Sequence, residues 1–244
     1  GNSRSIGLLV EKDLETGISN IKNAAPLKII DYSDFEKRDV RQLEEYSKGN
    51  KKEFEHLISS KIRFRKNIFQ NYSKTKTFNL PSICAIGSEA ENLPESNRTE
   101  GSSGIHGPKR YLWDNSPRKE FWRFHEDDSD KLEGDILRYV SLEDSDDVLS
   151  DNFNHGLTDT PLAAVYPRRT MMVFSLVEIF YQAFTQVNSI HYRMRVGSPR
   201  IKRKLNKIIM SFPTGMSFWE RERLKLQAEK ALAILKNMKA IPYG

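Results

Sequence analysis

The clearest pattern in the sequence is an amphipathic helix near its C-terminal end. Ser217 and Glu220 stand three residues apart just before it. This is the spacing of a capping box, in which the two side chains bond backbone N–H groups that a first helical turn leaves unpaired. Apolar residues then recur at intervals of four and three, which places them along one helical face. They are Leu224, Ala228, Ala231, Leu235 and Met238. The sequence therefore predicts a helix from Ser217 to Met238.

Two further elements are predicted just before this helix. From Thr170 to Asn188, apolar residues line one face at helical spacing, which predicts a second helix. Between the two helices, Ile208 to Phe212 is a short apolar run that ends at Pro213, and it is typical of a buried strand. We therefore expect both helices to pack beside a sheet that contains Ile208 to Phe212.

The rest of the chain has a weaker pattern. A helix interrupted near Gly49 is predicted over residues 39–69, where apolar residues are spread among many charges. Short apolar or alternating runs predict four strands, at residues 6–10, 27–32, 80–86 and 135–142. No internal repeat of fixed period links these elements. The expected fold class is mixed α/β, with a sheet flanked by helices.

Charge is distributed unevenly along the chain, whose formal net charge is +6. Seven basic residues and no acid lie between Arg193 and Lys207, whereas eleven acids lie between Glu126 and Asp151. The basic run lacks the interleaved aromatic residues that stack on nucleic-acid bases. We therefore expect a solvent-exposed loop that meets the acidic segment or an acidic partner surface, and no nucleic-acid binding.

Several classes of protein and site are disfavoured by simple features. Cys84 is the single cysteine, so an intrachain disulfide and a multi-cysteine metal site are excluded. The five histidines show no metal-ligand spacing. No apolar run approaches the roughly 20 residues of a membrane span, and residues 1–25 lack the pattern of a signal peptide. These features favour a reducing, cytoplasmic compartment. Because the chain begins at Gly1 without methionine, we interpret it as a segment of a longer protein.

One glycine-rich stretch resembles a phosphate-binding loop but departs from the known motif. Residues 101–109 read GSSGIHGPK. A Walker motif requires Gly-Lys followed by Ser or Thr, whereas here Pro108 precedes Lys109 and Arg110 follows it. The residues alone name no catalytic group.

Three further segments of the chain have a recognisable sequence. They are GSEAENLPESNRTEGSSGIHGPKRYLWD, FSLVEIFYQAFTQVNS and LNKIIMSFPTGMSFWERERLKLQAEKAL. These segments resemble a bacterial virulence-factor family that is called SrfB-like and whose members are far longer than this chain. The order of elements also resembles the amino-terminal lobe of the actin-like ATPases, especially the seventy-kilodalton heat-shock chaperones. These resemblances cover about residues 75–238. They imply an actin-like lobe segment at residues 75–244 that follows a helical and strand-containing part at residues 1–74.

The chaperone resemblance also implies roles for individual residues. Lys109 matches a lysine that contacts a terminal phosphate, and the alternative is a structural salt bridge. Pro213 with Arg221 matches a conformational relay, and the alternative for Pro213 is a plain turn. ATP and magnesium are then the cofactors of the full-length protein. This chain lacks both Asp-hydrophobic-Gly phosphate loops of that pattern, so we expect the segment alone to lack ATPase activity. The alternative is a non-catalytic protein-binding or scaffold module with the same fold. Either reading expects protein partners that the sequence does not identify.

Overall fold

The fold was analysed in a computed structural model of the chain. It describes residues 4–5, 7–12, 16–19, 21, 24–30, 54–55, 58–59, 61–64, 84–93, 102–124, 132, 135–140 and 165–241. The strands are β1 (Arg4–Ser5), β2 (Leu8–Leu9), β3 (Ala25–Pro26), β4 (Ile29–Ile30), β5 (Phe54–Glu55), β6 (Ile58–Ser59), β7 (Lys61–Phe64), β8 (Cys84–Ile86) and β9 (Gly104–His106). The helices are α2 (Gly87–Asn92), η3 (Pro108–Tyr111), η4 (Asp135–Tyr139), α4 (Thr170–Asn188), α5 (Ile190–Arg195) and α6 (Phe218–Asn237), of which η3 and η4 are 3₁₀ helices.

The strands form small antiparallel sheets. β7 is the centre of a three-stranded sheet and pairs with β8 on one side and β9 on the other. Ile62 of β7 lies opposite Ile86 and Ile105 in the two neighbouring strands. Three two-stranded pairs, β1 with β6, β2 with β3 and β4 with β5, complete the sheets among the described residues. The chain therefore combines helices with small antiparallel sheets, in agreement with the expected mixed class.

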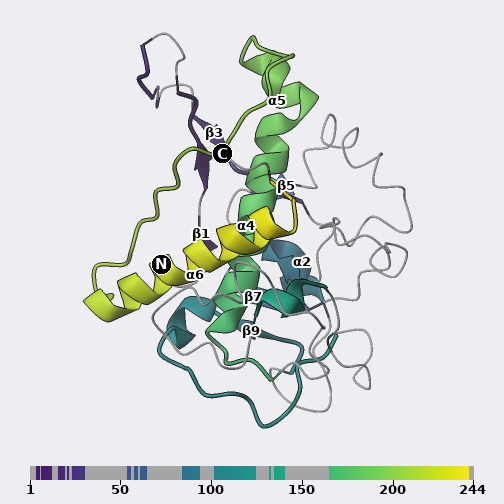
Figure 1. The fold of residues 1–244 in the computed structure, drawn as a ribbon, viewed down its shortest axis with the longest axis vertical. Helices are drawn as coiled ribbons and strands as arrows, with labels where there is room; N and C mark the ends of the chain where they lie inside the picture. The colour runs from purple at the N-terminus through teal and green to yellow at the C-terminus, as the bar shows by residue number, and fades with distance from the viewer. Residues whose placement is uncertain are drawn as a thin grey trace.

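Helix α4 runs through the centre of the structure, and α6 packs across it (Figure 1). Below this crossing, Phe64 of β7 is fully buried between two other aromatic rings. Its ring centroid lies 5.6 Å from that of Trp122 and 5.4 Å from that of Phe174, both in edge-to-face geometry. Trp122 also donates a 2.8 Å hydrogen bond to the carbonyl of Tyr166. This cluster fixes the three-stranded sheet against α4.

The two predicted long helices are confirmed. The second helix was predicted from Thr170 to Asn188, and α4 has these bounds. The predicted capping box is present at Ser217, which is the N-cap of α6. The apolar stripe is also confirmed, since Leu224 and Leu235 are buried where α6 meets α4.

The prediction of a strand from Ile208 to Phe212 is wrong. This run belongs to no helix or sheet, and Ile209 is 80% exposed. The reason is that α4 and α6 pack directly on each other, so their apolar faces are covered without an intervening strand. Among the described residues, the strands that contact α4 instead include β8 of the three-stranded sheet and β4 of a two-stranded one.

Other expectations were met in part. The predicted strands at 6–10 and 27–32 contain β2 and β4, and the one at 80–86 ends in β8, while residues 80–83 lie outside the described residues. The helix predicted over 39–69 is wrong where the structure describes it, because β5, β6 and β7 occupy that region. The strand predicted over 135–142 is also wrong. Its residues 135–139 form η4, because Ile136, Leu137 and Val140 are buried together at a helical spacing.

The capping box leads to a testable prediction. Ser217 Oγ accepts a hydrogen bond from the Glu220 N–H at 3.3 Å, and the Ser217 N–H donates to the Glu220 carboxylate at 2.9 Å. We expect Ser217→Ala to lower the free energy of unfolding by about 1 kcal/mol near neutral pH. The measurement is urea unfolding, with exposed Ser211→Ala as the control that should change little.

The same cap should respond to pH. The hydrogen bonds from Ser217 lower the pKa of the Glu220 carboxyl. A carboxyl whose pKa is lower in the folded state stabilises the fold above its unfolded pKa of about 4.3, and this contribution is lost as pH falls through the folded pKa. The difference between wild type and Ser217→Ala should therefore shrink in acid below about pH 4. Alanine keeps the backbone N–H of residue 217, so an unchanged difference across this window would contradict a contribution from the hydrogen bond that the Ser217 hydroxyl donates to the Glu220 carboxylate.

Candidate functional site

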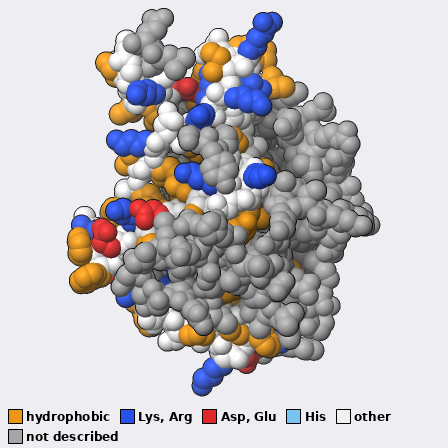
Figure 2. Space-filling model, in the orientation of Figure 1, with side chains coloured by type: hydrophobic (Ala, Val, Ile, Leu, Met, Phe, Trp, Pro, Cys, Tyr) orange, Lys and Arg blue, Asp and Glu red, His pale blue; other side chains and the backbone are white. Residues whose placement is uncertain are grey.

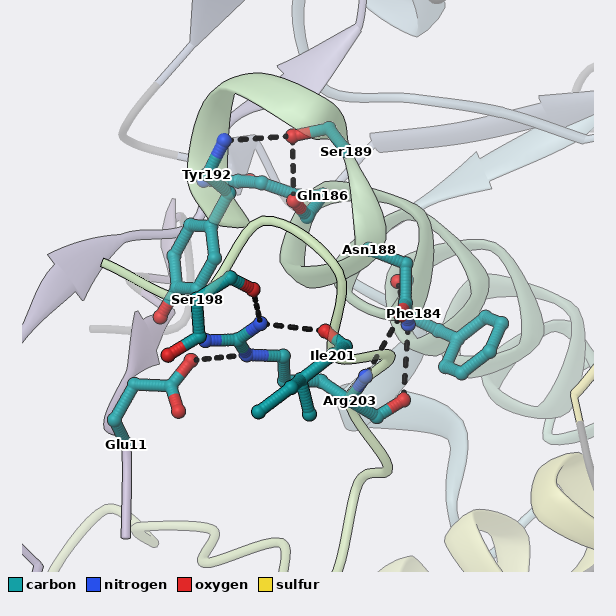
Figure 3. A network of polar contacts seen from close by, with 9 residues as sticks. All are labelled: Glu11, Phe184, Gln186, Asn188, Ser189, Tyr192, Ser198, Ile201 and Arg203. Carbon is teal, nitrogen blue, oxygen red and sulfur yellow. Dashed lines mark hydrogen bonds and ion pairs between the residues drawn. The ribbon is translucent and has the colours of Figure 1, made fainter. Parts of the chain in front are cut away.

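The C-terminal end of α4 holds two segments that are distant in sequence. Gln186 accepts a 2.8 Å hydrogen bond from the Lys28 N–H and donates one of 3.0 Å to the carbonyl of Pro26. The next helix, α5, begins at Ile190, and its N-cap is Ser189, whose hydroxyl accepts a hydrogen bond from the Tyr192 N–H at 3.2 Å. Figure 3 shows the bond between Ser189 and Tyr192, together with the 2.8 Å hydrogen bond that the Ser189 hydroxyl donates to the carbonyl of Gln186. This corner of the fold is therefore defined by side chains as well as by packing.

Arg203 is the residue that fastens the chain after α5 to this corner (Figure 3). The side-chain amide of Asn188 bonds both backbone groups of Arg203, at 2.8 Å to its N–H and 3.0 Å to its carbonyl. The Arg203 guanidinium lies 3.2 Å from the Glu11 carboxylate and also donates to the carbonyls of Ser198 and Ile201. One member of the basic run is therefore turned inward, where it pairs with an acid of the N-terminal region.

A groove lies between α4, α6 and the segment that follows Arg203. Residues 204–212, which we call the free segment, lead towards the start of α6 and form one wall of this groove, whose volume is about 600 Å³. Its apolar lining includes Phe180, Phe184, Leu205, Met210, Leu232 and Ile241. Its basic lining is Lys204, Lys207, Lys225 and Lys236. Figure 2 shows basic and apolar side chains side by side over this part of the surface.

The groove combines positive charge with apolar surface. Its four exposed lysines face one lining acid, Glu229. Lysine side chains lay their methylene stems on apolar surface while the ammonium stays in water, so both kinds of contact are available to one ligand. A cleft lined by one sign of charge concentrates opposite charges near it. This arrangement is suited to binding a ligand that is both acidic and apolar.

Exposed apolar side chains continue beyond the groove. Ile209 and Phe212 of the free segment are 80% and 39% exposed, and Phe218 and Trp219 in the first turn of α6 are 64% and 73% exposed. The ring centroids of Phe218 and Trp219 lie 5.6 Å apart, in edge-to-face geometry. The sequence analysis missed this pair. A signal was present, because both aromatic residues lie off the apolar stripe that begins at Leu224.

Lys109 lies elsewhere in the fold. It belongs to η3, which contacts α4 and follows Gly107, a residue with left-handed backbone geometry at φ 70°. Burial lowers the pKa of the Lys109 ammonium group. The structure therefore places Lys109 half-buried at the start of a short helical turn, and its contact with a phosphate stays a prediction.

Pro213 and Arg221 both make a hydrogen bond with Met216. The Met216 N–H donates a 3.0 Å hydrogen bond to the carbonyl of Pro213, and the Arg221 guanidinium donates one of 3.0 Å to the carbonyl of Met216. The two residues thus support the turn that leads into α6. Their role as a conformational relay stays a prediction.

The expected pairing of the basic run with residues 126–151 also stays a prediction, because most of that acidic segment lies outside the described residues. Members of the run that line the groove are exposed, as the sequence predicted for a loop. Within the described ranges, no helix has the length and apolar character needed to cross a membrane. The described residues also contain no cluster of three or more potential metal-ligating side chains.

Fold and site together define a mixed helical and antiparallel-sheet protein with a basic, partly apolar binding groove. The family model described as virulence factor SrfB matches residues 1–242, and the chain therefore belongs to the SrfB family. The resemblance expected from three internal segments is thus confirmed, and the match includes the N-terminal residues that those segments left out. Searches of curated proteins and of solved structures find no match.

Proposed function

We propose that this part of the SrfB-family protein is a non-catalytic binding module that holds an acidic, partly apolar segment of a protein partner. The observation that carries the proposal is the groove between α4, α6 and the free segment, where four lysines border an apolar floor. Complementary charge raises the rate of encounter and selects among partners, and apolar contact supplies affinity. The apolar side chains beyond the groove favour a polypeptide, because they extend the surface past the reach of a small ligand.

A synthetic peptide tests this proposal. The probe is a fluorescein-labelled ten-residue peptide of alternating valine and glutamate, and its binding is followed by fluorescence anisotropy. We expect Lys204→Glu with Lys225→Glu to weaken binding by about tenfold or more, because both lysines line the groove. The matched control carries Lys12→Glu and Lys119→Glu, which make the same charge change at exposed positions outside the groove lining.

Two outcomes would contradict the proposal. One is absence of peptide binding at low salt, and the other is equal weakening in the groove variant and its control. Duplex DNA serves as a competing polyanion in the same assay, and we expect it not to bind at micromolar concentration. Micromolar DNA binding that falls with salt at a slope of about −0.9 per neutralised phosphate would identify a nucleic-acid site instead.

A second candidate function is nucleotide binding by the longer protein, with this segment as one lobe of an actin- or chaperone-like machine. Lys109 favours it, because this half-buried lysine lies in the first turn of η3, two residues after its left-handed N-cap Gly107. A lysine ammonium is a point charge well suited to a phosphate. In the longer protein ATP and magnesium would be the cofactors, and the turn joining Pro213 to Arg221 would act as the relay.

The segment alone is expected to lack ATPase activity. Phosphoryl transfer requires a backbone cradle for the phosphates and acidic ligands for the metal, and the sequence lacks both acidic phosphate loops of the actin-like pattern. A phosphate-release assay should therefore give the rate of a heat-inactivated sample, with no change in Lys109→Ala. Phosphate release that the wild type shows and Lys109→Ala abolishes would prove this expectation wrong.

A further inference from the structure

The free segment, residues 204–212, has an unusual backbone environment. It crosses from the corner held by Arg203 to the turn before α6 as one open trace (Figure 1). None of its residues belongs to a helix or a sheet, and within the described part of the chain none of them makes a hydrogen bond. Its N–H and C=O groups are therefore available to a partner, as they are along the edge strand of a sheet.

The sequence of the free segment is nevertheless that of a strand. Ile208 to Phe212 reads IIMSF, and β-branched and aromatic residues are enriched in strands. The structure leaves this run without a neighbouring strand and leaves Ile209 80% exposed. An added strand would pair the backbone and cover apolar surface at the same time.

Both ends of the free segment are fixed. Asn188 clamps the backbone of Arg203 at one end, and the hydrogen bond between Pro213 and Met216 closes the turn at the other. A segment held at both ends loses less conformational entropy when it binds than a free chain does. The free segment is thus prepared to accept a partner without a large rearrangement.

Charge indicates what the partner is. Lys204 and Lys207 lie in the free segment, and Lys225 and Lys236 line the groove from α6. Pairing with the same segment of a second copy would bring like charges together, which destabilises neighbouring strands. An acidic strand would instead meet opposite charge.

We infer that the free segment is a docking strand. An acidic, extended segment of a protein partner adds to it through backbone hydrogen bonds and places alternate side chains in the groove. This inference rests on the proposed binding function and specifies how the partner is held. The unpaired, strand-like free segment is then the part of the site that recognises the partner.

Proline substitution distinguishes strand addition from side-chain contact. Adjacent residues of an extended chain direct their N–H groups to opposite edges, and a partner strand uses only one edge. Ile208→Pro and Ile209→Pro each remove one N–H. Because Ile208 lines the groove and Ile209 does not, each proline variant is compared with alanine at the same position, which removes the side chain but keeps the N–H. Relative to its alanine variant, we expect one proline variant to weaken binding of the valine–glutamate peptide by about tenfold and the other by less than about threefold. Equal effects of the two variants would overturn the inference.

Amide hydrogen exchange measured by NMR provides the second readout. On addition of the peptide, we expect protection at alternate residues of the free segment. A peptide of the same sequence that is N-methylated at every residue is the matched probe, and it should neither bind nor protect. Protection that appears without peptide and rises with protein concentration would show that a second copy is the occupant, and would also overturn the inference.

Failure of the inference can be told from failure of the proposed function. If the peptide binds and binding depends on Lys204 and Lys225, but alternate protection is absent, the groove binds acidic segments by side chains alone. If the wild-type protein does not bind the peptide at all, the proposed function itself is wrong.

Discussion

Replacing Phe64 with alanine is expected to lower the free energy of unfolding by about 3–5 kcal/mol. Phe64 is fully buried, and its ring contacts Trp122 and Phe174 in edge-to-face geometry. Its removal leaves a cavity where the three-stranded sheet meets α4, and it also removes two aromatic contacts worth about 0.5–1.5 kcal/mol each. The measurement is equilibrium unfolding in urea followed by circular dichroism.

Phe218→Ala is the matched control for this prediction. Phe218 is 64% exposed, so its truncation should change stability by less than about 0.5 kcal/mol. A loss below about 1 kcal/mol in Phe64→Ala would show that the sheet is not fixed to α4 by this ring. A comparable loss in both variants would show that the aromatic pair of α6 is covered in solution.

Gly104→Ala is expected to destabilise the fold by more than about 4 kcal/mol. A Cβ atom at Gly104 would lie 2.2 Å from the carbonyl oxygen of Ile62 and 2.7 Å from the Cα of Arg63. Both atoms belong to the backbone of β7, with which β9 pairs at this position. A flexible side chain could move away, but here one strand must separate from the other.

Gly215→Ala provides the comparison, because nothing lies within 4 Å of a Cβ added there. Thermal unfolding should show a large fall in the midpoint for Gly104→Ala and almost none for Gly215→Ala. Wild-type stability in Gly104→Ala would mean that β9 pairs with β7 in a different register.

The sequence predicted the long helices well, because their signals are local. The capping box at Ser217 and the spacing of Leu224 and Leu235 depend on residues a few positions apart, and the structure has α6 where they place it. The same is true of α4, whose predicted bounds were confirmed. Regular spacing over five turns is enough to specify a helix whatever lies around it.

The strands could not be predicted in the same way. All strands in the described residues are two to four residues long, which is too short for alternation to be recognised. The run from Ile208 to Phe212 has strand-like residues but no partner, because pairing depends on which surfaces α4 and α6 leave open. Propensity identified the residues, and tertiary packing decided their environment.

The candidate site was predicted only in part. The basic run from Arg193 to Lys207 was recognised as an exposed loop, and two of its lysines, Lys204 and Lys207, line the groove. The inward turn of Arg203 could not be predicted, since its partner Glu11 is 192 residues away in sequence. The apolar floor of the groove could not be predicted either, because it forms only where α4 and α6 meet.

The position of α6 in the chain has a consequence for folding during synthesis. Much of the apolar surface of α4 is covered by α6, yet α6 begins only at Phe218, thirty residues after α4 ends at Asn188. At a translation rate of about 5–20 residues per second, α4 is synthesised seconds before α6, the helix that covers it. The nascent chain therefore exposes an aggregation-prone helix during that interval, and it is the emergence of α6 that allows the core to close.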